Sequence, residues 1–203
     1  MPSTVEPSYA DRLRRLERRG RLRRVLDVQA PYRWNLRRLR PGRTLDVGCG
    51  LGRNLAHLSA DPASSGVGVD HNPACVAECV SRGFEAFTPE DFEQSAVAVR
   101  SGFDTLLFAH VLEHLDEEDG AALLRRYLPY LRPGGKVVVI VPQSAGQRTD
   151  PTHVRLVDRE ALARLASLLD LGVVSVRSFP LPRPFGQVFP YNEDVSVLTV
   201  AAR

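Results

Sequence analysis

Several features that would place a protein in a membrane or outside the cell are scarce or missing in this chain of 203 residues. No apolar run reaches the roughly eighteen residues that a membrane-spanning helix needs. The amino-terminal residues lack the apolar core of a signal peptide. Only three cysteines occur, and neither their odd number nor their spacing suggests disulfides or a metal site; they are Cys49, Cys75 and Cys79. We therefore expect no membrane span, reduced thiols and a cytoplasmic location.

Lysine is also nearly absent, since Lys136 is the only one and arginine supplies the other positive charges of a chain with net charge +3. Arginine is concentrated between residues 12 and 24, a segment that could bind nucleic acid or an anionic membrane surface. Leucines recur there at near-helical spacing, which favours an amphipathic helix with a solvated arginine face.

Length and composition fit one globular domain, with 43% hydrophobic and 25% charged residues. We predict a helical cap segment over residues 1–40 and one α/β domain over residues 41–203. Short apolar runs alternate with helical stretches in that domain, as expected of parallel strands covered by helices on both faces. The predicted strands are 44–48, 66–70, 84–87, 103–109 and 136–141, and the predicted helices are 52–60, 73–82, 91–99 and 117–131.

The carboxyl-terminal part follows a different pattern. A helix is predicted over 158–171, followed by strands over 173–176 and 195–200. Four prolines between residues 179 and 192 exclude a crossover helix, so the two strands are most simply antiparallel. The whole pattern predicts a doubly wound, mostly parallel seven-stranded α/β sheet with helices on both faces and an antiparallel last strand.

A glycine-rich turn follows the first predicted strand. Gly48, Gly50 and Gly52 alternate there, so the backbone can turn sharply and approach a ligand closely. The helix that follows would direct its unpaired N–H groups at that ligand. Asp70 ends the next strand, where a carboxylate can accept hydrogen bonds from both hydroxyls of a ribose. The pattern predicts a site for an adenosine-containing cofactor.

Four segments, in this order, resemble the class I S-adenosylmethionine-dependent methyltransferases. Residues 45–52 are similar to the family's first motif, Asp-x-Gly-x-Gly-x-Gly, and 68–70 to its ribose-binding second motif. Residues 103–115 resemble the fourth-strand region, and 131–136 the turn before the fifth strand. The resemblance implies a Rossmann-like fold and an enzyme that converts S-adenosyl-L-methionine to S-adenosyl-L-homocysteine.

The same resemblance implies which residues bind the cofactor. The glycine turn would hold the methionine and ribose portions, and Asp91 and Phe92 would contact the adenine. The latter pair departs from the family's usual Gly-Asp-Ala form and could equally begin a helix. The predicted cofactor-binding residues are Asp46, Gly48, Cys49, Gly50, Gly52, Asp70, His71, Asp91, Phe92, Ala109 and His110. A nicotinamide-dependent oxidoreductase stays as an alternative, although Arg53 occupies the place of its third glycine.

Methyl transfer requires an aligned acceptor and, for a hydroxyl, removal of its proton. Acceptor-facing residues are expected where the fourth and fifth strands end. His153 is the first candidate for general base because imidazole titrates near neutral pH, and Asp150 could orient it. Both residues could instead only shape a turn. His114 and His110 are the alternative bases.

Residues 110–114 also spell His-x-x-Glu-His, the inverted zinc-protease pattern. That pattern needs a helix with both histidines on one face and a third ligand. Because it follows a buried strand here, we expect no metal site.

Two missing motifs narrow the acceptor. The absence of an Asn/Asp-Pro-Pro-aromatic sequence after the fourth strand disfavours nucleobase amines, and the absence of Pro-Cys disfavours a pyrimidine carbon. The leading hypothesis is a small-molecule O-methyltransferase, monomeric or homodimeric. Arg33 and Trp34 could close over the cofactor or the acceptor, and Trp34 could equally anchor its helix to the core. Residues 179–191 could form a wall of the acceptor pocket or pack against the body of the protein. The alternatives are an RNA or protein methyltransferase that docks through the arginine-rich segment, and a non-catalytic cofactor-binding partner.

Overall fold

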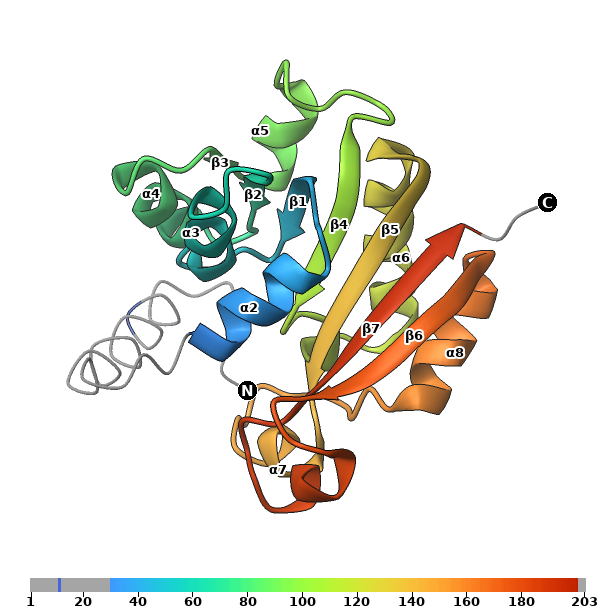
Figure 1. Ribbon diagram of the computed structural model, residues 1–203. Coiled ribbons are helices and arrows are strands. Elements are labelled where there is room, and N and C mark those ends of the chain that lie inside the picture. The colour runs from blue at the N-terminus through green and yellow to red at the C-terminus, as the bar shows by residue number, and fades with distance from the viewer. Residues whose placement is uncertain (1–10, 12–29, 201–203) are drawn as a thin grey trace. The chain divides into compact units, whose positions relative to one another are not determined.

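The computed structural model describes residue 11 and residues 30–200 (Figure 1). The arginine-rich segment of residues 12–29 lies outside the described residues, so its predicted amphipathic helix and docking role stay predictions. The chain divides into two compact units, residues 1–98 and residues 99–203. Across the described part of the chain, no helix combines the length and the apolar character that crossing a bilayer requires.

The first unit contains three parallel strands in the order β3-β2-β1. Their inner residues are buried, which explains the uninterrupted apolar runs in the sequence. The strands are β1 (Arg43–Val47), β2 (Ser65–Val69) and β3 (Ala86–Phe87). Val47 pairs with Val69 at the carboxyl ends of β1 and β2. The glycine turn and Asp70 therefore start from adjacent strand ends.

The helices of the first unit begin where their capping residues predict. Asn72 Oδ1 accepts from the Ala74 N–H at 3.0 Å, and Thr88 Oγ1 accepts from the Asp91 N–H at 3.2 Å. A proline follows each cap and fixes the first helical residue. The helix predicted over 91–99 therefore begins earlier than expected, and it ends at Gln94. The helices are α2 (Ala30–Arg38), α3 (Arg53–Ser59), α4 (Pro73–Ser81) and α5 (Pro89–Gln94).

The second unit contains four strands in the order β4-β5-β7-β6. β4 and β5 are parallel, whereas β7 is antiparallel to both β5 and β6. The antiparallel pair predicted from the proline-rich connection is thus confirmed. The strands are β4 (Phe103–Ala109), β5 (Leu131–Pro142), β6 (Leu171–Phe179) and β7 (Glu193–Val200).

The helices of the second unit differ from the sequence prediction mainly at their ends. The last helix ends at Leu168 rather than residue 171, because Asp170 takes a left-handed φ of 53° and Leu171 already belongs to β6. The α-helices are α6 (Glu117–Tyr127), α7 (Ser144–Gln147) and α8 (Arg159–Leu168), and the 3-10 helices are η1 (Leu112–His114), η2 (Leu128–Tyr130) and η3 (Arg183–Gln187). α8 contacts both α6 and β6 (Figure 1).

The carboxyl ends of β4 and β5 in the second unit bring together residues that are far apart in the sequence. Ala109 at the end of β4 pairs with Ile140 of β5. Two residues farther along β5, Pro142 pairs with Glu193 at the start of β7. The segments that follow β4 and β5 and the segment that precedes β7 therefore meet at these strand ends, where acceptor-facing residues were expected.

Candidate functional site

The glycine turn of the first unit takes the backbone conformation that its sequence requires. Gly48, Gly50 and Gly52 have φ values of 77°, 54° and 79°, in the left-handed region that favours glycine. The N–H groups of Gly48 and Cys49 both donate to the Val69 carbonyl, at 2.7 and 3.1 Å. The end of β2 thus holds the turn in place, and a side chain at any of the three glycines would strain it.

Asp70 is joined to this turn by a direct hydrogen bond. Its Oδ2 accepts from the Gly50 N–H at 2.8 Å, and its Oδ1 accepts from the Asn72 N–H at 2.9 Å. Each carboxylate oxygen has a further lone pair, so the group can still accept from a ligand hydroxyl. His71 is half-exposed beside it, with Nδ1 3.9 Å from Asp70 Oδ1.

Asp46, inside β1, is a buried carboxyl group with an unsatisfied oxygen. Oδ1 accepts from Asn54 Nδ2 at 3.3 Å, whereas Oδ2 has no hydrogen-bond partner among the described residues. Burial is the main cause that raises the pKa of Asp46, to about 7. A buried acceptor without a donor is costly, so this oxygen is suited to a ligand that brings an N–H group or a positive charge.

The cysteines pack behind the turn. All three are buried, and none forms a disulfide in the described part of the chain. Cys79 Sγ donates to the Gly50 carbonyl at 3.2 Å, and Arg82 donates to the Leu51 carbonyl. Hydrogen bonding to Cys79, together with burial, raises the pKa of the Cys49 thiol. Cys79 and Arg82 are structural supports of the turn that the motif alone did not indicate.

Asp91 and Phe92 both lie in the first turn of α5. Asp91 is exposed, and its Oδ2 accepts from Thr88 Oγ1 at 2.7 Å. Phe92 is fully buried, its ring centroid is 6.4 Å from that of Phe87, and its N–H donates to the Thr88 carbonyl. The adenine contact stays a prediction for both residues.

In the second unit, His110 follows β4 and lies between two carboxylates. Its Nδ1 is 3.2 Å from Glu113 Oε1, and its Nε2 is 2.9 Å from Glu193 Oε1. Burial alone would lower the pKa of His110, but Glu193 and Glu113 together raise it to about 9. A ring that is protonated at neutral pH cannot accept a proton, so His110 does not suit the role of general base. Its cofactor role, like that of Ala109, stays a prediction.

The other two candidate bases lie together. His114, in η1, has Nδ1 at 3.1 Å from both the carbonyl and the hydroxyl of Thr152. The Thr152 hydroxyl donates in turn to Asp150 Oδ1 at 2.6 Å. Burial lowers the pKa of His114, which favours its neutral form. The hydrogen bonds of Asp150 thus lead through Thr152 to His114.

His153 donates from Nδ1 to the Gln147 carbonyl at 3.0 Å, and its ring centroid is 4.9 Å from that of His114. The structure therefore brings together two histidines that are 39 positions apart in the sequence. The predicted pairing of His153 with Asp150 stays a prediction. Glu113, fully buried beside this pair, was not predicted as a site residue, although the His-x-x-Glu-His pattern contains it.

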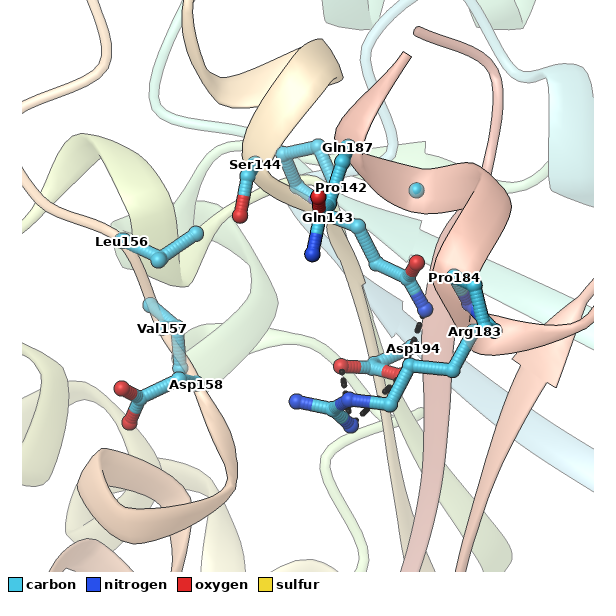
Figure 2. Close-up of a pocket in the computed structure, with 11 residues that line it drawn as sticks. Pro142, Gln143, Ser144, Leu156, Val157, Asp158, Arg183, Pro184, Gln187 and Asp194 are labelled. Atoms are coloured by element: carbon cyan, nitrogen blue, oxygen red, sulfur yellow. Dashed lines mark hydrogen bonds and ion pairs between the residues drawn. The ribbon is translucent and has the colours of Figure 1, made fainter. Parts of the chain in front are cut away.

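A pocket of about 340 Å³ opens at the carboxyl end of β5 (Figure 2). Arg183 and Asp194 lie on one side, with Arg183 Nη1 3.3 Å from Asp194 Oδ2. Gln143, which also lines the pocket, donates from Nε2 to Asp194 Oδ1 at 2.8 Å. The facing side consists of Leu156, Val157 and Asp158. Part of the 179–191 segment, which was predicted to wall the acceptor pocket, lines this cavity.

Trp34 and Arg33, predicted to close over a ligand, belong to α2. The Trp34 side chain is 55% exposed, and the Arg38 guanidinium carbon lies 5.3 Å from its ring centroid. Their predicted role in the pocket stays a prediction.

Comparison with known proteins places this chain in a family. Residues 11–176 match a family model described as a methyltransferase domain. The trans-aconitate 2-methyltransferase of Deinococcus radiodurans is 35% identical over 100 residues, which are 48% of this chain and 37% of that protein. The matched region spans only 21 to 37% of the length of the curated relatives.

Solved structures show the same fold. A SAM-dependent methyltransferase from Archaeoglobus fulgidus superimposes with a TM-score of 0.64 at 20% identity, over 83% of this chain and 93% of that one. The 1,6-didemethyltoxoflavin-N1-methyltransferase of Burkholderia thailandensis, solved with S-adenosylhomocysteine, gives 0.60 at 19% identity, over 100% and 92%. The predicted α/β fold, mostly parallel with an antiparallel last strand, is confirmed as a Rossmann-like methyltransferase fold. Because the family model matches well over half of the residues, this chain belongs to the methyltransferase-domain family, whose cofactor is S-adenosylmethionine, as predicted.

Proposed function

We propose that this protein transfers a methyl group from S-adenosylmethionine to an oxygen atom of a small molecule. The observation that carries the choice of a small acceptor is the pocket at the end of β5. Its volume of about 340 Å³ falls within the range of small-ligand sites. Apolar side chains from Leu156 and Val157 face the Arg183–Asp194 pair there, so the pocket suits a ligand with an apolar body and a few polar groups.

The first unit supplies the residues that we propose bind the cofactor. The free lone pairs of Asp70 would accept hydrogen bonds from the two ribose hydroxyls, beside the main chain of the glycine turn. The unpaired Oδ2 of Asp46 would accept from the ammonium group of the methionine portion, which brings the positive charge that a buried carboxylate lacks. Asp91 would contact the adenine amino group. When bound, the cofactor supplies a methyl carbon that its sulfonium has already activated.

The second unit supplies the groups that we propose act on the acceptor. A hydroxyl must lose its proton as it is methylated, so an oxygen acceptor needs a group that removes or weakens that proton. His114 and His153 are the candidates, since their rings lie together and His110 is held in its protonated form. An amine that is already neutral would not need them. This difference supports oxygen over nitrogen as the acceptor.

A nitrogen acceptor is the second candidate function. It is favoured by the names of two similar proteins, a phosphoethanolamine N-methyltransferase of Arabidopsis thaliana and the 1,6-didemethyltoxoflavin-N1-methyltransferase described above. We also propose a cytoplasmic location, which is supported by three buried thiols that form no disulfide among the described residues.

The experiment is an acceptor screen with S-adenosylhomocysteine release as the signal. Hydroxylated small molecules are compared with amines of the same carbon skeleton, and RNA and protein mixtures are assayed in parallel. We expect release with members of the hydroxyl set and none with the matched amines. Release only with the amines would refute the oxygen acceptor, and release only with RNA or protein would refute a small-molecule acceptor.

A further inference from the structure

Three potential metal ligands of the second unit lie close together. One ligand atom from each of Glu113, His114 and His153 lies within 4.8 Å of the other two. Glu113 and His114 belong to η1, just after β4, whereas His153 lies in the segment before α8. The two imidazole planes meet at 64°, so the rings converge edge to face and do not stack. A single ion at 2.0–2.2 Å from each ligand would need side-chain adjustments of about 1 Å.

One carboxylate oxygen of Glu113 is buried and lacks a hydrogen-bond donor among the described residues. Its side chain is fully buried, Oε1 lies 3.2 Å from His110 Nδ1, and Oε2 has no hydrogen-bond partner in the part of the chain that the structure describes. The other ring nitrogen of His110, Nε2, lies 2.9 Å from Glu193 Oε1, so the ring contacts a second carboxylate besides Glu113. A buried carboxylate oxygen without a donor is destabilising, and a metal ion would satisfy it.

Both histidines are oriented as metal ligands usually are. Nδ1 of His114 lies 3.1 Å from the Thr152 carbonyl, and Nδ1 of His153 lies 3.0 Å from the Gln147 carbonyl. Because a carbonyl oxygen can only accept, Nδ1 of each ring must carry the hydrogen. The lone pair of a neutral ring then lies on Nε2. Histidines that bind metals characteristically donate their other ring N–H to a carbonyl or carboxylate in this way.

Main-chain hydrogen bonds fix the two segments that supply the ligands. The Glu113 carbonyl accepts from the N–H groups of Val154 and Arg155, at 2.7 and 3.3 Å. The Arg155 side chain also donates from Nε to the Leu115 carbonyl at 2.9 Å. His153 is therefore held against η1 by the residues that follow it, and the three ligands are positioned before any ion binds.

We propose that Glu113, His114 and His153 form a binding site for a divalent first-row transition-metal ion such as Zn²⁺ or Mn²⁺. Two imidazole nitrogens and one carboxylate oxygen favour such an ion over Mg²⁺, which prefers oxygen ligands. The proposal departs from the sequence-based expectation of no metal, and it pairs His114 with His153 rather than with His110.

A metal ion at this site would also help to remove the proton from an acceptor hydroxyl, an inference that rests on the proposed function. Three protein ligands leave coordination positions open, as in catalytic zinc sites. An acceptor hydroxyl bound there would have its pKa lowered by the ion. The two histidines would then act through the ion, and hydroxylated acceptors would be favoured over amines.

The test is calorimetric titration of the full-length protein, freed of metal by a chelator, with ZnCl₂ and separately with MgCl₂. No cofactor or acceptor is present, so the result is independent of methyl transfer. We expect about one equivalent of Zn²⁺ to bind, at least tenfold more tightly than Mg²⁺. Glu113→Gln, which keeps the shape of the side chain, and His153→Ala should each weaken Zn²⁺ binding by about 100-fold.

The matched control is His71→Ala, which removes a half-exposed histidine of the first unit and should leave Zn²⁺ affinity unchanged. Equal binding by the wild type and His153→Ala, or no binding by the wild type, would overturn the metal site. If Glu113→Gln loses its circular-dichroism signal, His153→Ala in the partly exposed segment decides the question. A metal-binding protein that methylates no hydroxyl would refute only the proposed oxygen acceptor.

Discussion

Asp46→Asn tests whether the buried Asp46 carboxyl group makes the stability of the protein depend on pH. The folded protein raises the pKa of Asp46 from 3.8 to about 7, chiefly through burial. The protonated Asp46 carboxyl group favours the folded state, because the folded protein binds this proton more tightly than the unfolded chain does. This contribution to stability is complete below the pKa of the unfolded chain, and it is lost as pH rises through the pKa of the folded protein. The stability of the folded protein should therefore fall between about pH 4 and pH 7. A difference of about three pKa units corresponds to about 4 kcal/mol of unfolding free energy.

The amide in Asp46→Asn has the same shape and does not titrate, and its oxygen can still accept from Asn54. We expect the variant to gain up to about 4 kcal/mol relative to the wild type between pH 4 and pH 8. Urea unfolding followed by circular dichroism at the two pH values measures this difference. The same stability difference at both pH values would show that Asp46 titrates normally in the folded protein and would refute the reasoning.

The same site predicts how S-adenosylmethionine changes this behaviour. An ammonium group bound at Oδ2 of Asp46 would stabilise the ionised carboxylate. Saturating cofactor should therefore stabilise the wild type more at pH 8 than at pH 5, and Asp46→Asn should show no such difference. Cofactor stabilisation that is independent of pH in the wild type would place the ammonium elsewhere.

Three further predictions concern single residues. S-adenosylhomocysteine at 100 times its Kd should stabilise the wild type by about 2.7 kcal/mol in thermal unfolding, whereas NADH should not stabilise it. Asp70→Ala should abolish this stabilisation, and an unchanged stabilisation would dismiss Asp70 as the ribose ligand. Gly68→Ala should lower the free energy of unfolding in urea by about 1–3 kcal/mol, because the added Cβ would lie 2.7 Å from Cys49 Sγ. An unchanged free energy of unfolding would show that the turn can move away from β2. His153→Ala should slow turnover while the affinity for S-adenosylhomocysteine stays unchanged, and full activity would exclude this residue from catalysis.

The sequence alone was sufficient for the features that depend on neighbouring residues. The glycines after β1 and the carboxylate after β2 follow from local backbone rules, and the structure joins them through the Gly50–Asp70 hydrogen bond. The prolines between residues 179 and 192 excluded a crossover helix, which predicted the antiparallel pairing of the last two strands that the structure shows. Helix ends were less predictable, because a cap such as Thr88 or a left-handed residue such as Asp170 shifts a boundary by a few positions.

Only the tertiary structure decided the chemistry of the histidines. The pKa of His110 depends on Glu193, 83 positions away, which reaches it because β7 begins where β5 ends. His114 and His153 meet because Val154 and Arg155 hydrogen-bond to the main chain of η1. Spacing along the chain suggested His110 with His114 as a pair. The fold instead places His114 beside His153 and His110 between two carboxylates, because side-chain contacts between distant segments depend on strand register and loop packing, which no local pattern encodes.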